Sequence, residues 1–281
     1  MIRHQHNMSP TRARSIALSF GKVRLAVEAF LPKSDEVKLF SFSLETDAEV
    51  VRRLESFLSA DEVSRADRFL LPHLRRRYVV CRGVLREILG RATAQAANDI
   101  RFCYEQWGKP LLVNSLIPPL HFNVSHSQDR GLVALARSPL GVDLEVWHER
   151  LRPRAIVSQV LSQREQSAWE TLPSNDRDAT IMRLWVCKEA LLKALGLGIA
   201  EGLQHISFPL PVPLQGSFFP DHLDPGLLLH LDEDGTCHRN AWVDARSWKV
   251  QLLHDIPAAF TALATHPSLV QVTWTEHSTR S

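Results

Sequence analysis

Hydrophobic and polar residues alternate along the chain in patterns that predict short strands and helices. Residues 37–44 alternate as in a strand, residues 48–58 suggest a helix, and residues 72–90 carry apolar side chains at helical spacing. Short strand-like segments then follow, separated by Gly, Pro, Asn and Ser residues, at 100–105, 120–127, 131–137 and 141–147. Together they predict a sheet that follows a long amphipathic helix.

The same order of helix and strands returns in the second part of the chain. Helical spacing recurs at residues 161–171 and 176–195, and further strand-like segments follow at 205–208, 227–231, 241–245, 248–253 and 260–264. We therefore predict an α+β protein with two similar-sized halves that meet near Ser138 to Gly141. No residue-level repeat is visible, so an internal duplication stays a guess.

Three stretches of chain follow from this pattern. Residues 1–30 mix His, Arg, Ser and Pro without a sustained period, which predicts a loosely ordered N-terminal extension. An N-terminal half then covers residues 31–138, and a C-terminal half covers residues 139–281.

Composition excludes several classes of protein. Of 281 residues, 44% are hydrophobic and 23% are charged, as in ordinary globular proteins. No apolar run reaches the roughly 18 residues of a membrane-spanning helix and no secretory signal is visible, so we expect a cytoplasmic protein without a membrane partner. The net charge of +2 is too balanced to indicate a nucleic-acid partner. Widely spaced cysteines within apolar patterns predict reduced core residues at Cys81, Cys103, Cys187 and Cys237.

The segment GVDLEV at residues 141–146 places two carboxylates on one face of a predicted strand. Val142, Leu144 and Val146 alternate with Asp143 and Glu145, so burial of the apolar residues sends both acids to the other face. Residues two apart on a strand are roughly 7 Å apart, close enough for their oxygens to converge on one hard cation such as magnesium. The plainer alternative is an edge strand with a solvated acidic face.

The helix at 176–195 contains a lysine where an apolar residue is expected. Lys188 continues the apolar stripe between Trp185 and Leu191, so its ammonium must either reach water or lie against an anion. Glu189 and Lys193 are four residues apart and share a helix face. An ordinary Glu–Lys pair explains these two residues but gives no reason for Lys188.

These motifs resemble the paired signature of the 4'-phosphopantetheinyl transferase superfamily, of the surfactin-synthetase-activating type. GVDLE is followed some forty residues later by WVCKEALLKALGLG, which matches the family's W-x-x-K-E-A-x-x-K-A pattern without a gap. The resemblance implies magnesium ligands at Asp143, Glu145 and Glu189. It also implies that Lys188 and Lys193 neutralise phosphate charge on coenzyme A.

Two further segments fit the same family. HFNVSHS at residues 121–127 is similar to the family's F-N-x-S-H-S, which assigns Ser125 and His126 to the phosphates of coenzyme A. WGKP matches the family's G-K-P turn and offers Lys109. A Ser–His pair can also indicate a hydrolase triad, but the Gly-x-Ser-x-Gly elbow is missing here.

A segment rich in arginine, residues 64–89, precedes these motifs. Its arginines suit phosphate oxygens, and Arg75, Arg82 and Arg86 fall on one side of the predicted helix, opposite the apolar stripe. A solvated helix face is the plain alternative. The resemblance assigns this region to the 3'-phosphate of coenzyme A, with Arg65 and Arg77 as the nearest matches.

The resemblance implies a fold, a reaction and partners. The fold is a two-halved monomer with pseudo-twofold symmetry, in which each half is a small antiparallel sheet packed against a long helix. The enzyme transfers the 4'-phosphopantetheine arm of coenzyme A to a serine of an apo acyl or peptidyl carrier protein, releasing adenosine 3',5'-bisphosphate. Its catalytic residues are Glu189, Lys193 and Glu165, where either glutamate, or a metal-bound water, is the base.

Two rival functions remain open on the sequence. One is a different magnesium-dependent phosphotransferase or phosphohydrolase, although no Walker-type glycine loop supports it. The other is a non-catalytic module that binds carrier proteins or nucleic acid through the face from Arg75 to Arg86. For nucleic acid, only Phe69 and Tyr78 are available as stacking residues there.

Overall fold

The computed structural model describes residues 29–105, 107–113, 118–197, 202–220, 222–223 and 248–278. Apart from residues 29 and 30, the predicted N-terminal extension lies outside these residues, as do the predicted strands at 227–231 and 241–245. None of the helices in the described ranges has a stretch long and apolar enough to cross a membrane.

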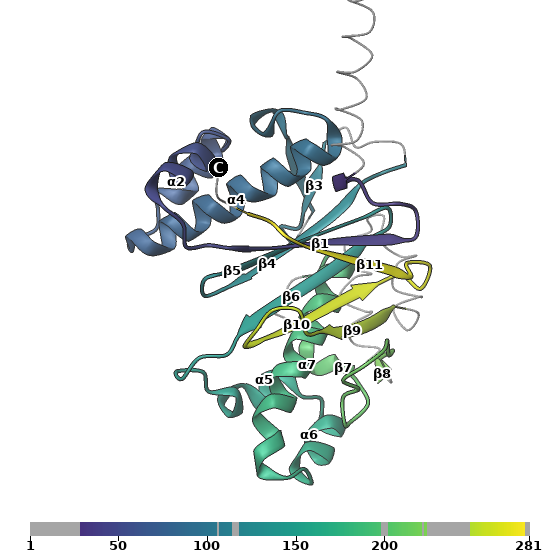
Figure 1. The fold of residues 1–281 in the computed structure, drawn as a ribbon. Helices are drawn as coiled ribbons and strands as arrows, with labels where there is room; N and C mark the ends of the chain where they lie inside the picture. The colour runs from purple at the N-terminus through teal and green to yellow at the C-terminus, as the bar shows by residue number, and fades with distance from the viewer. Residues whose placement is uncertain are drawn as a thin grey trace, which may run out of the picture.

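The first half of the chain forms a sheet covered by helices (Figure 1). The sheet has the strand order β11-β1-β5-β4, in which β11 is Gln271–Glu276, and α2 and α4 lie over it. The elements are β1 Glu36–Ser43, α2 Ala48–Glu55, α3 Ala60–Ala66, α4 Pro72–Thr93, β2 Phe102–Tyr104, β3 Pro110–Leu112, β4 His121–Ser127 and β5 Arg130–Ala136.

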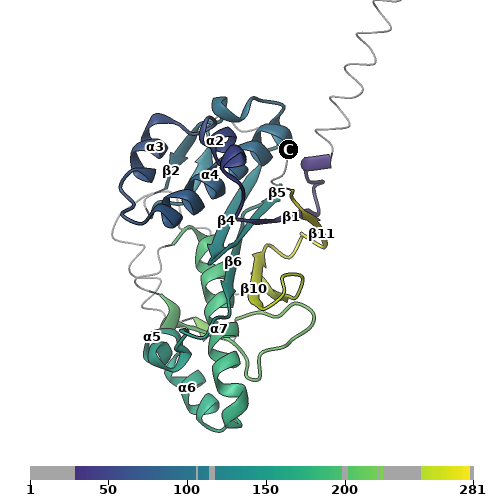
Figure 2. The ribbon, with the colours of Figure 1, turned by 60° about the vertical axis from the view of Figure 1, so that its left-hand side comes forward.

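The second half repeats this plan with a second long helix. Its sheet has the order β6-β10-β9, and α7 runs along it (Figure 2). Its elements are β6 Leu140–Val146, α5 Val157–Val160, α6 Gln163–Glu170, α7 Ser174–Leu195, β7 Ile206–Ser207, β8 His222–Leu223, β9 Lys249–Leu253 and β10 Ala259–Thr265. The order β1-β5-β4 in one half corresponds to β6-β10-β9 in the other. This match confirms the α+β fold with two similar halves, although the amino-acid sequence shows no repeat at the level of residues.

In the part of the chain that the structure describes, three hydrophobic cores hold the elements together. One lies between α2, α4 and the first sheet and contains Phe40, Val84 and Leu135. Another lies between α7 and the second sheet and contains Leu191 and Ala262. In the third, the remaining faces of the two sheets meet each other through Leu39, Leu132, Val142, Leu144 and Leu263. Val142 and Leu144 are therefore buried as the alternation predicts, and the acids between them face α7.

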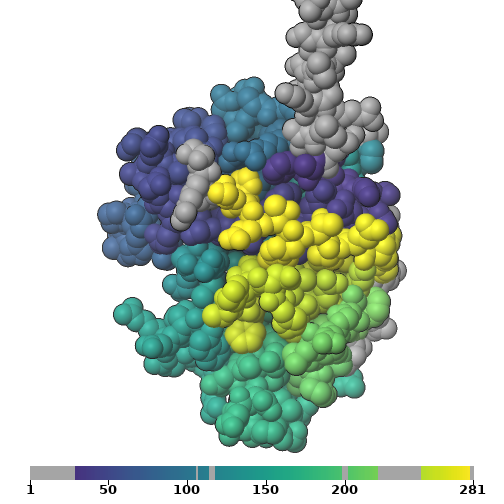
Figure 3. Space-filling model, in the orientation of Figure 1, coloured from purple at the N-terminus to yellow at the C-terminus, as the bar shows by residue number. Residues whose placement is uncertain are grey.

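The C-terminal strand β11, Gln271–Glu276, crosses back to the first half. It pairs in parallel with β1, so the first sheet is mixed, whereas the other pairings in both sheets are antiparallel. In the space-filling view the C-terminal residues, in yellow, lie against the purple band of β1 (Figure 3). The alternation did not predict this strand because most of its side chains are exposed, and only Trp274 is half-buried. A strand drawn from residues 139–281 thus completes the sheet of residues 31–138.

Capping residues explain where several helices begin. Asp47 accepts a hydrogen bond from the backbone N–H of Val50 at the start of α2, and a capping box of Ser162 and Glu165 begins α6. Helix α7 ends at Gly196 with φ 77°, a conformation that favours glycine.

Among the cysteines, Cys81 and Cys187 are buried as predicted, Cys103 is exposed against the prediction, and Cys237 lies outside the described residues.

Candidate active site

Strand β6 presents its two carboxylates to helix α7. Gly141, Asp143 and Glu145 occupy alternate positions on the strand, and α7 packs against this face. A Cβ atom at Gly141 would overlap the backbone of Ala190 and Ala194, so glycine allows strand and helix to touch. This close approach brings Asp143, which is buried, alongside the side chains of α7.

A cavity of about 190 Å³ lies where β4, β6 and α7 meet. Most of the predicted site residues converge on it although they come from three separate elements. Its lining comprises Val124, Ser125, His126, Asp143, Glu145, Trp185, Glu189 and Lys193.

Hydrogen bonds organise the carboxylates around this cavity. The Nζ of Lys193 lies 2.5 Å from Oδ1 of Asp143 and donates to Oγ of Ser125 at 3.2 Å. Ser125 in turn donates to the same Asp143 oxygen at 2.9 Å. The hydroxyl of Ser127 donates to Oε2 of Glu145 at 2.8 Å. Each of the two strand carboxylates therefore has a serine that fixes its orientation.

The charges in the cavity are not balanced. Burial and the nearby Asp143 carboxylate raise the pKa of Glu189 to about 7. Burial likewise raises the pKa of Glu145, and Asp143 adds to this effect. Burial and the Lys193 ammonium lower the pKa of His126. Two carboxylate oxygens, Oδ2 of Asp143 and Oε1 of Glu189, are buried and have no hydrogen-bond partner among the described residues.

These donors fit a hard divalent cation. Three carboxylates that repel one another, two of them with a buried oxygen that lacks a partner among the described residues, are the ligand chemistry that magnesium prefers. Among the described residues, no three His, Cys, Asp or Glu side chains already stand close enough to enclose a metal ion. The ammonium of Lys193 instead neutralises Asp143.

Two predicted site residues lie away from the cavity, in the core of the second half. Lys188 is fully buried, and its Nζ lies 2.5 Å from Oε2 of Glu165 and 2.6 Å from the carbonyl oxygen of Val160. Glu165 also accepts the backbone N–H groups of Ser162 and Phe208. Of the two alternatives for the Lys188 ammonium, water or an anion, the structure shows the anion, and that anion is a protein carboxylate. Neither a phosphate role for Lys188 nor a base role for Glu165 fits this geometry.

Lys109 lies between the ends of β6 and α7. Its Nζ donates to the carbonyl oxygen of Ala194 at 3.0 Å and contacts that of Leu140 at 3.5 Å. Burial lowers its pKa to about 8. Lys109 does not line the cavity, so its assignment to coenzyme A stays a prediction.

The structure does not gather the predicted arginines into one site. Arg65 is exposed and lies over the ring of Tyr78, whereas Arg77 donates to Glu45. Arg82 and Arg86 do not form the solvated helix face that was the plain alternative, because both pair with the buried Glu62 and Arg86 is itself buried. For the 3'-phosphate, Arg65 is therefore the better candidate.

Sequence reasoning missed three residues of this site. Gly141 is required by the approach of α7, and Asn123 and Ser127 bond β4 to β6. The signal was present in HFNVSHS, where Asn123, Ser125 and Ser127 occupy every second position and therefore one face of a strand.

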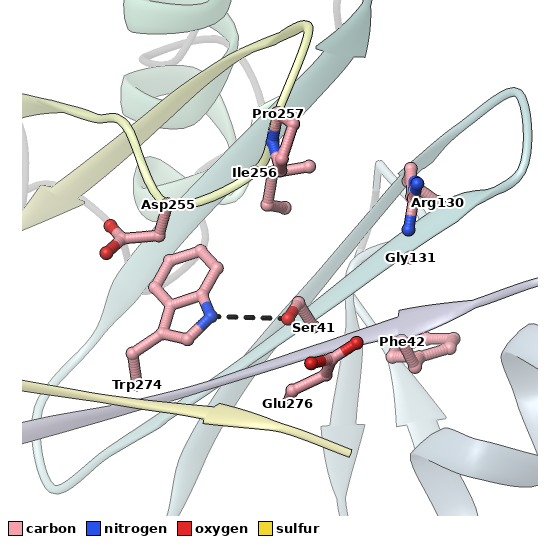
Figure 4. Close-up of a pocket in the computed structure, with 9 residues that line it drawn as sticks. All are labelled: Ser41, Phe42, Arg130, Gly131, Asp255, Ile256, Pro257, Trp274 and Glu276. Carbon is pink, nitrogen blue, oxygen red and sulfur yellow. Dashed lines mark hydrogen bonds between the residues drawn. The ribbon is translucent and has the colours of Figure 1, made fainter. Parts of the chain in front are cut away.

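A second, larger cavity of about 430 Å³ lies beside β1, β11 and the turn at 255–257 (Figure 4). The indole of Trp274 reaches across to Ser41, with a hydrogen bond of 3.2 Å. Asp255, Glu276 and Arg130 bring charges to it, but all of the predicted site residues lie elsewhere.

Known proteins are similar to this chain over most of its length. Residues 29–139 match the family model for the N-terminal part of 4'-phosphopantetheinyl transferase, and residues 139–261 match that of the 4'-phosphopantetheinyl transferase superfamily. The 4'-phosphopantetheinyl transferase HetI of Nostoc sp. is 34% identical over 79% of this chain and 93% of its own length. Psf-1 of Bacillus pumilus is 31% identical over 62% and 74% of the two chains, and Sfp of Bacillus subtilis 27% over 62% and 76%. Both bear the same enzyme name. With two adjoining family models and a full-length relative in agreement, this chain belongs to the 4'-phosphopantetheinyl transferase superfamily and is an enzyme of that class.

Proposed function

We propose that this enzyme transfers the 4'-phosphopantetheine arm of coenzyme A to a serine of an apo acyl or peptidyl carrier protein of polyketide, nonribosomal peptide or fatty acid synthesis. The observation that carries the proposal is the cavity in which Asp143, Glu145 and Glu189 face Lys193. All of these groups come from one chain, which supports a monomer as the active form.

The reaction exchanges one phosphorus–oxygen bond for another. The serine oxygen of the carrier forms a bond to the β-phosphorus of coenzyme A, and the bond from that phosphorus to the bridging oxygen breaks. The bridging oxygen leaves with adenosine 3',5'-bisphosphate, and the serine proton passes to a base. Negative charge therefore grows on the leaving group, and positive groups placed beforehand lower the barrier.

Asp143, Glu145 and Glu189 are the residues that would hold magnesium against the diphosphate. The support is the buried oxygens of Asp143 and Glu189 that lack a partner among the described residues, and the raised pKa values of Glu145 and Glu189. When bound, the ion withdraws charge from the phosphate oxygens and orients them.

The cations and hydroxyl at the cavity would bind the phosphates. Lys193 is partly exposed, so its ammonium can exchange Asp143 for a phosphate oxygen without leaving the cavity. His126 and Ser125 line the same cavity and offer hydrogen bonds to phosphate. Lys193 is thus the cation best placed to stabilise the leaving group.

Glu189 is the base that we propose. It lines the cavity, and its Oε1 is buried without a hydrogen-bond partner among the described residues, which supports a carboxylate that can accept a proton. Glu165 is not a candidate, because both of its oxygens accept hydrogen bonds inside the core.

A mass measurement tests the proposal. The protein is incubated with coenzyme A, magnesium and several apo carrier proteins, and each carrier is weighed by mass spectrometry. We expect the gain of one phosphopantetheine arm on a serine, and a loss of kcat/KM of roughly 10²–10³-fold or more in Asp143→Asn and Glu189→Gln.

Glu149→Gln is the matched control, because Glu149 is an exposed carboxylate just beyond β6 and does not line the cavity. Unchanged carrier masses, or hydrolysis of coenzyme A without any acceptor, would overturn the proposed transfer.

A further inference from the structure

The two sheets meet at the active site through strands that do not pair by backbone hydrogen bonds. Within the described chain, β4 is an edge strand that pairs with β5, and β6 is an edge strand that pairs with β10. The two edges nevertheless lie side by side. Something other than a backbone ladder must therefore satisfy the outward N–H groups of β6.

Three side chains of β4 take the place of a neighbouring strand. The backbone N–H of Val142 donates to Oδ1 of Asn123 at 2.9 Å. The next outward N–H groups, of Leu144 and Val146, donate to the hydroxyls of Ser125 at 3.2 Å and Ser127 at 3.1 Å. Alternate N–H groups of β6 thus meet alternate side chains of β4, because both repeat every two residues.

Two of these side chains also hold a carboxylate. Ser125 accepts from Leu144 and donates to Asp143, and Ser127 accepts from Val146 and donates to Glu145. One hydroxyl thereby fixes both the strand and the acid beside it. Among the described residues, Asn123 makes no hydrogen bond to a carboxylate and bonds only to the backbone of β6.

We infer that Asn123 and Ser127 are positioning residues for the transferase reaction: they bond the edge of β6 to β4 and so aim Asp143 and Glu145 at the cavity. Neither residue lines the cavity, and both are buried, which separates them from residues that touch substrate. The inference rests on the proposed function, because it takes the two acids as the metal ligands. It adds a reason for the Asn and the second Ser of this motif in this chain.

The test compares removal of a hydroxyl with its preservation. Ser127→Ala removes the acceptor and the donor, whereas Ser127→Thr keeps both and adds a methyl group that strands tolerate. Loss of a group that orients a metal ligand typically weakens metal affinity or activity by roughly 10- to 100-fold. We expect that loss in Ser127→Ala, both in kcat and in magnesium affinity measured by titration calorimetry with coenzyme A present, and its recovery in Ser127→Thr.

Asn123→Ala provides the second arm. It leaves the buried N–H of Val142 unpaired but touches no acid, so we expect a larger fall in Tm than for Ser127→Ala and a smaller fall in magnesium affinity. Ser43→Ala is the control, since Ser43 bonds to its own loop at Glu45 and not to β6. It should keep both magnesium affinity and kcat.

The outcomes separate the two claims. If Ser127→Ala binds magnesium and turns over as the parent does while Asp143→Asn is inactive, the positioning inference is overturned and the proposed function stands. If Asp143→Asn also keeps the activity of the parent, the role of Asp143 as a metal ligand fails, whereas the proposed function itself fails only if the parent leaves the carrier masses unchanged. If Ser127→Thr is as weak as Ser127→Ala despite an unchanged Tm, the hydroxyl is not what positions Glu145.

Discussion

Helix α7 carries two lysine–carboxylate pairs with the same separation but different surroundings. Lys188–Glu165 and Lys193–Asp143 are both 2.5 Å apart. The first pair is 0% and 1% exposed, and Glu165 bonds further to the N–H groups of Ser162 and Phe208. In the second pair Lys193 is 25% exposed, and Oδ2 of Asp143 lacks a partner.

The contrast shows that the groups around a pair decide its role. We call Lys188–Glu165 the closed pair: its polar atoms are satisfied by hydrogen bonds, so it can hold elements together but cannot bind a ligand. We call Lys193–Asp143 the open pair. It lies beside Glu189, whose pKa is raised by burial and by the nearby Asp143 carboxylate, and groups with such shifted pKa values are common at functional sites. Two lysines five positions apart on one helix therefore do different work.

The largest expected effect comes from breaking the closed pair. Lys188→Met leaves the Glu165 carboxylate in the core without its counter-ion, and Glu165→Gln leaves the Lys188 ammonium without its counter-ion. Loss of one partner of a buried ion pair typically costs about 3–5 kcal/mol of unfolding free energy. Urea denaturation measures it. The double variant should lose less unfolding free energy than the sum of the two single losses. If the two losses simply add, the residues are not coupled as a pair.

The second effect has the opposite sign and concerns the open site. Folding raises the pKa of Glu189 from 4.5 to about 7, so the folded protein binds this proton more tightly than the unfolded chain does. Stability from this group is full below pH 4.5 and falls as pH rises towards 7. With a chelator present, Glu189→Gln should match the parent in acid and exceed it by on the order of 3 kcal/mol above neutral pH.

Denaturation curves of parent and Glu189→Gln across this pH range, both in chelator, measure the difference. A variant that is less stable than the parent at every pH would show that Glu189 is as well satisfied as Glu165. A constant difference across the range would show that its ionisation is not the cause.

The smallest expected effect concerns an exposed ion pair, which serves as the reference for the two pairs of α7. Arg154 and Asp178 lie 2.6 Å apart, but their side chains are 56% and 37% exposed. Exposed pairs contribute about 0–1 kcal/mol, so Arg154→Ala should change the free energy of unfolding by less than about 1 kcal/mol. Its Tm in low and high salt checks this. A loss as large as that of Lys188→Met would mean that distance alone sets the value of a pair.

Local patterns in the sequence located most elements of the fold. Alternation and helical spacing anticipated β1, α4, β4, β5, β6, α6 and α7, because each buries one face against a core. They missed β11, whose side chains are mostly exposed and whose position depends on pairing with β1. The pairing of Arg86 with Glu62 was likewise hidden, because it joins two helices.

For the site, the sequence by itself determined which residues could act. It placed Asp143 and Glu145 on one face of a strand and Glu189 and Lys193 on one face of a helix, since these faces follow from the periods of strand and helix. Only the tertiary structure decided which of them meet. The contact of Gly141 with α7 brought the strand and the helix together, and the packing of α6 gave Glu165 to Lys188. The burial and the charge balance of a side chain depend on neighbours that are distant in the chain. The local periodicity of apolar residues contains no information about these neighbours.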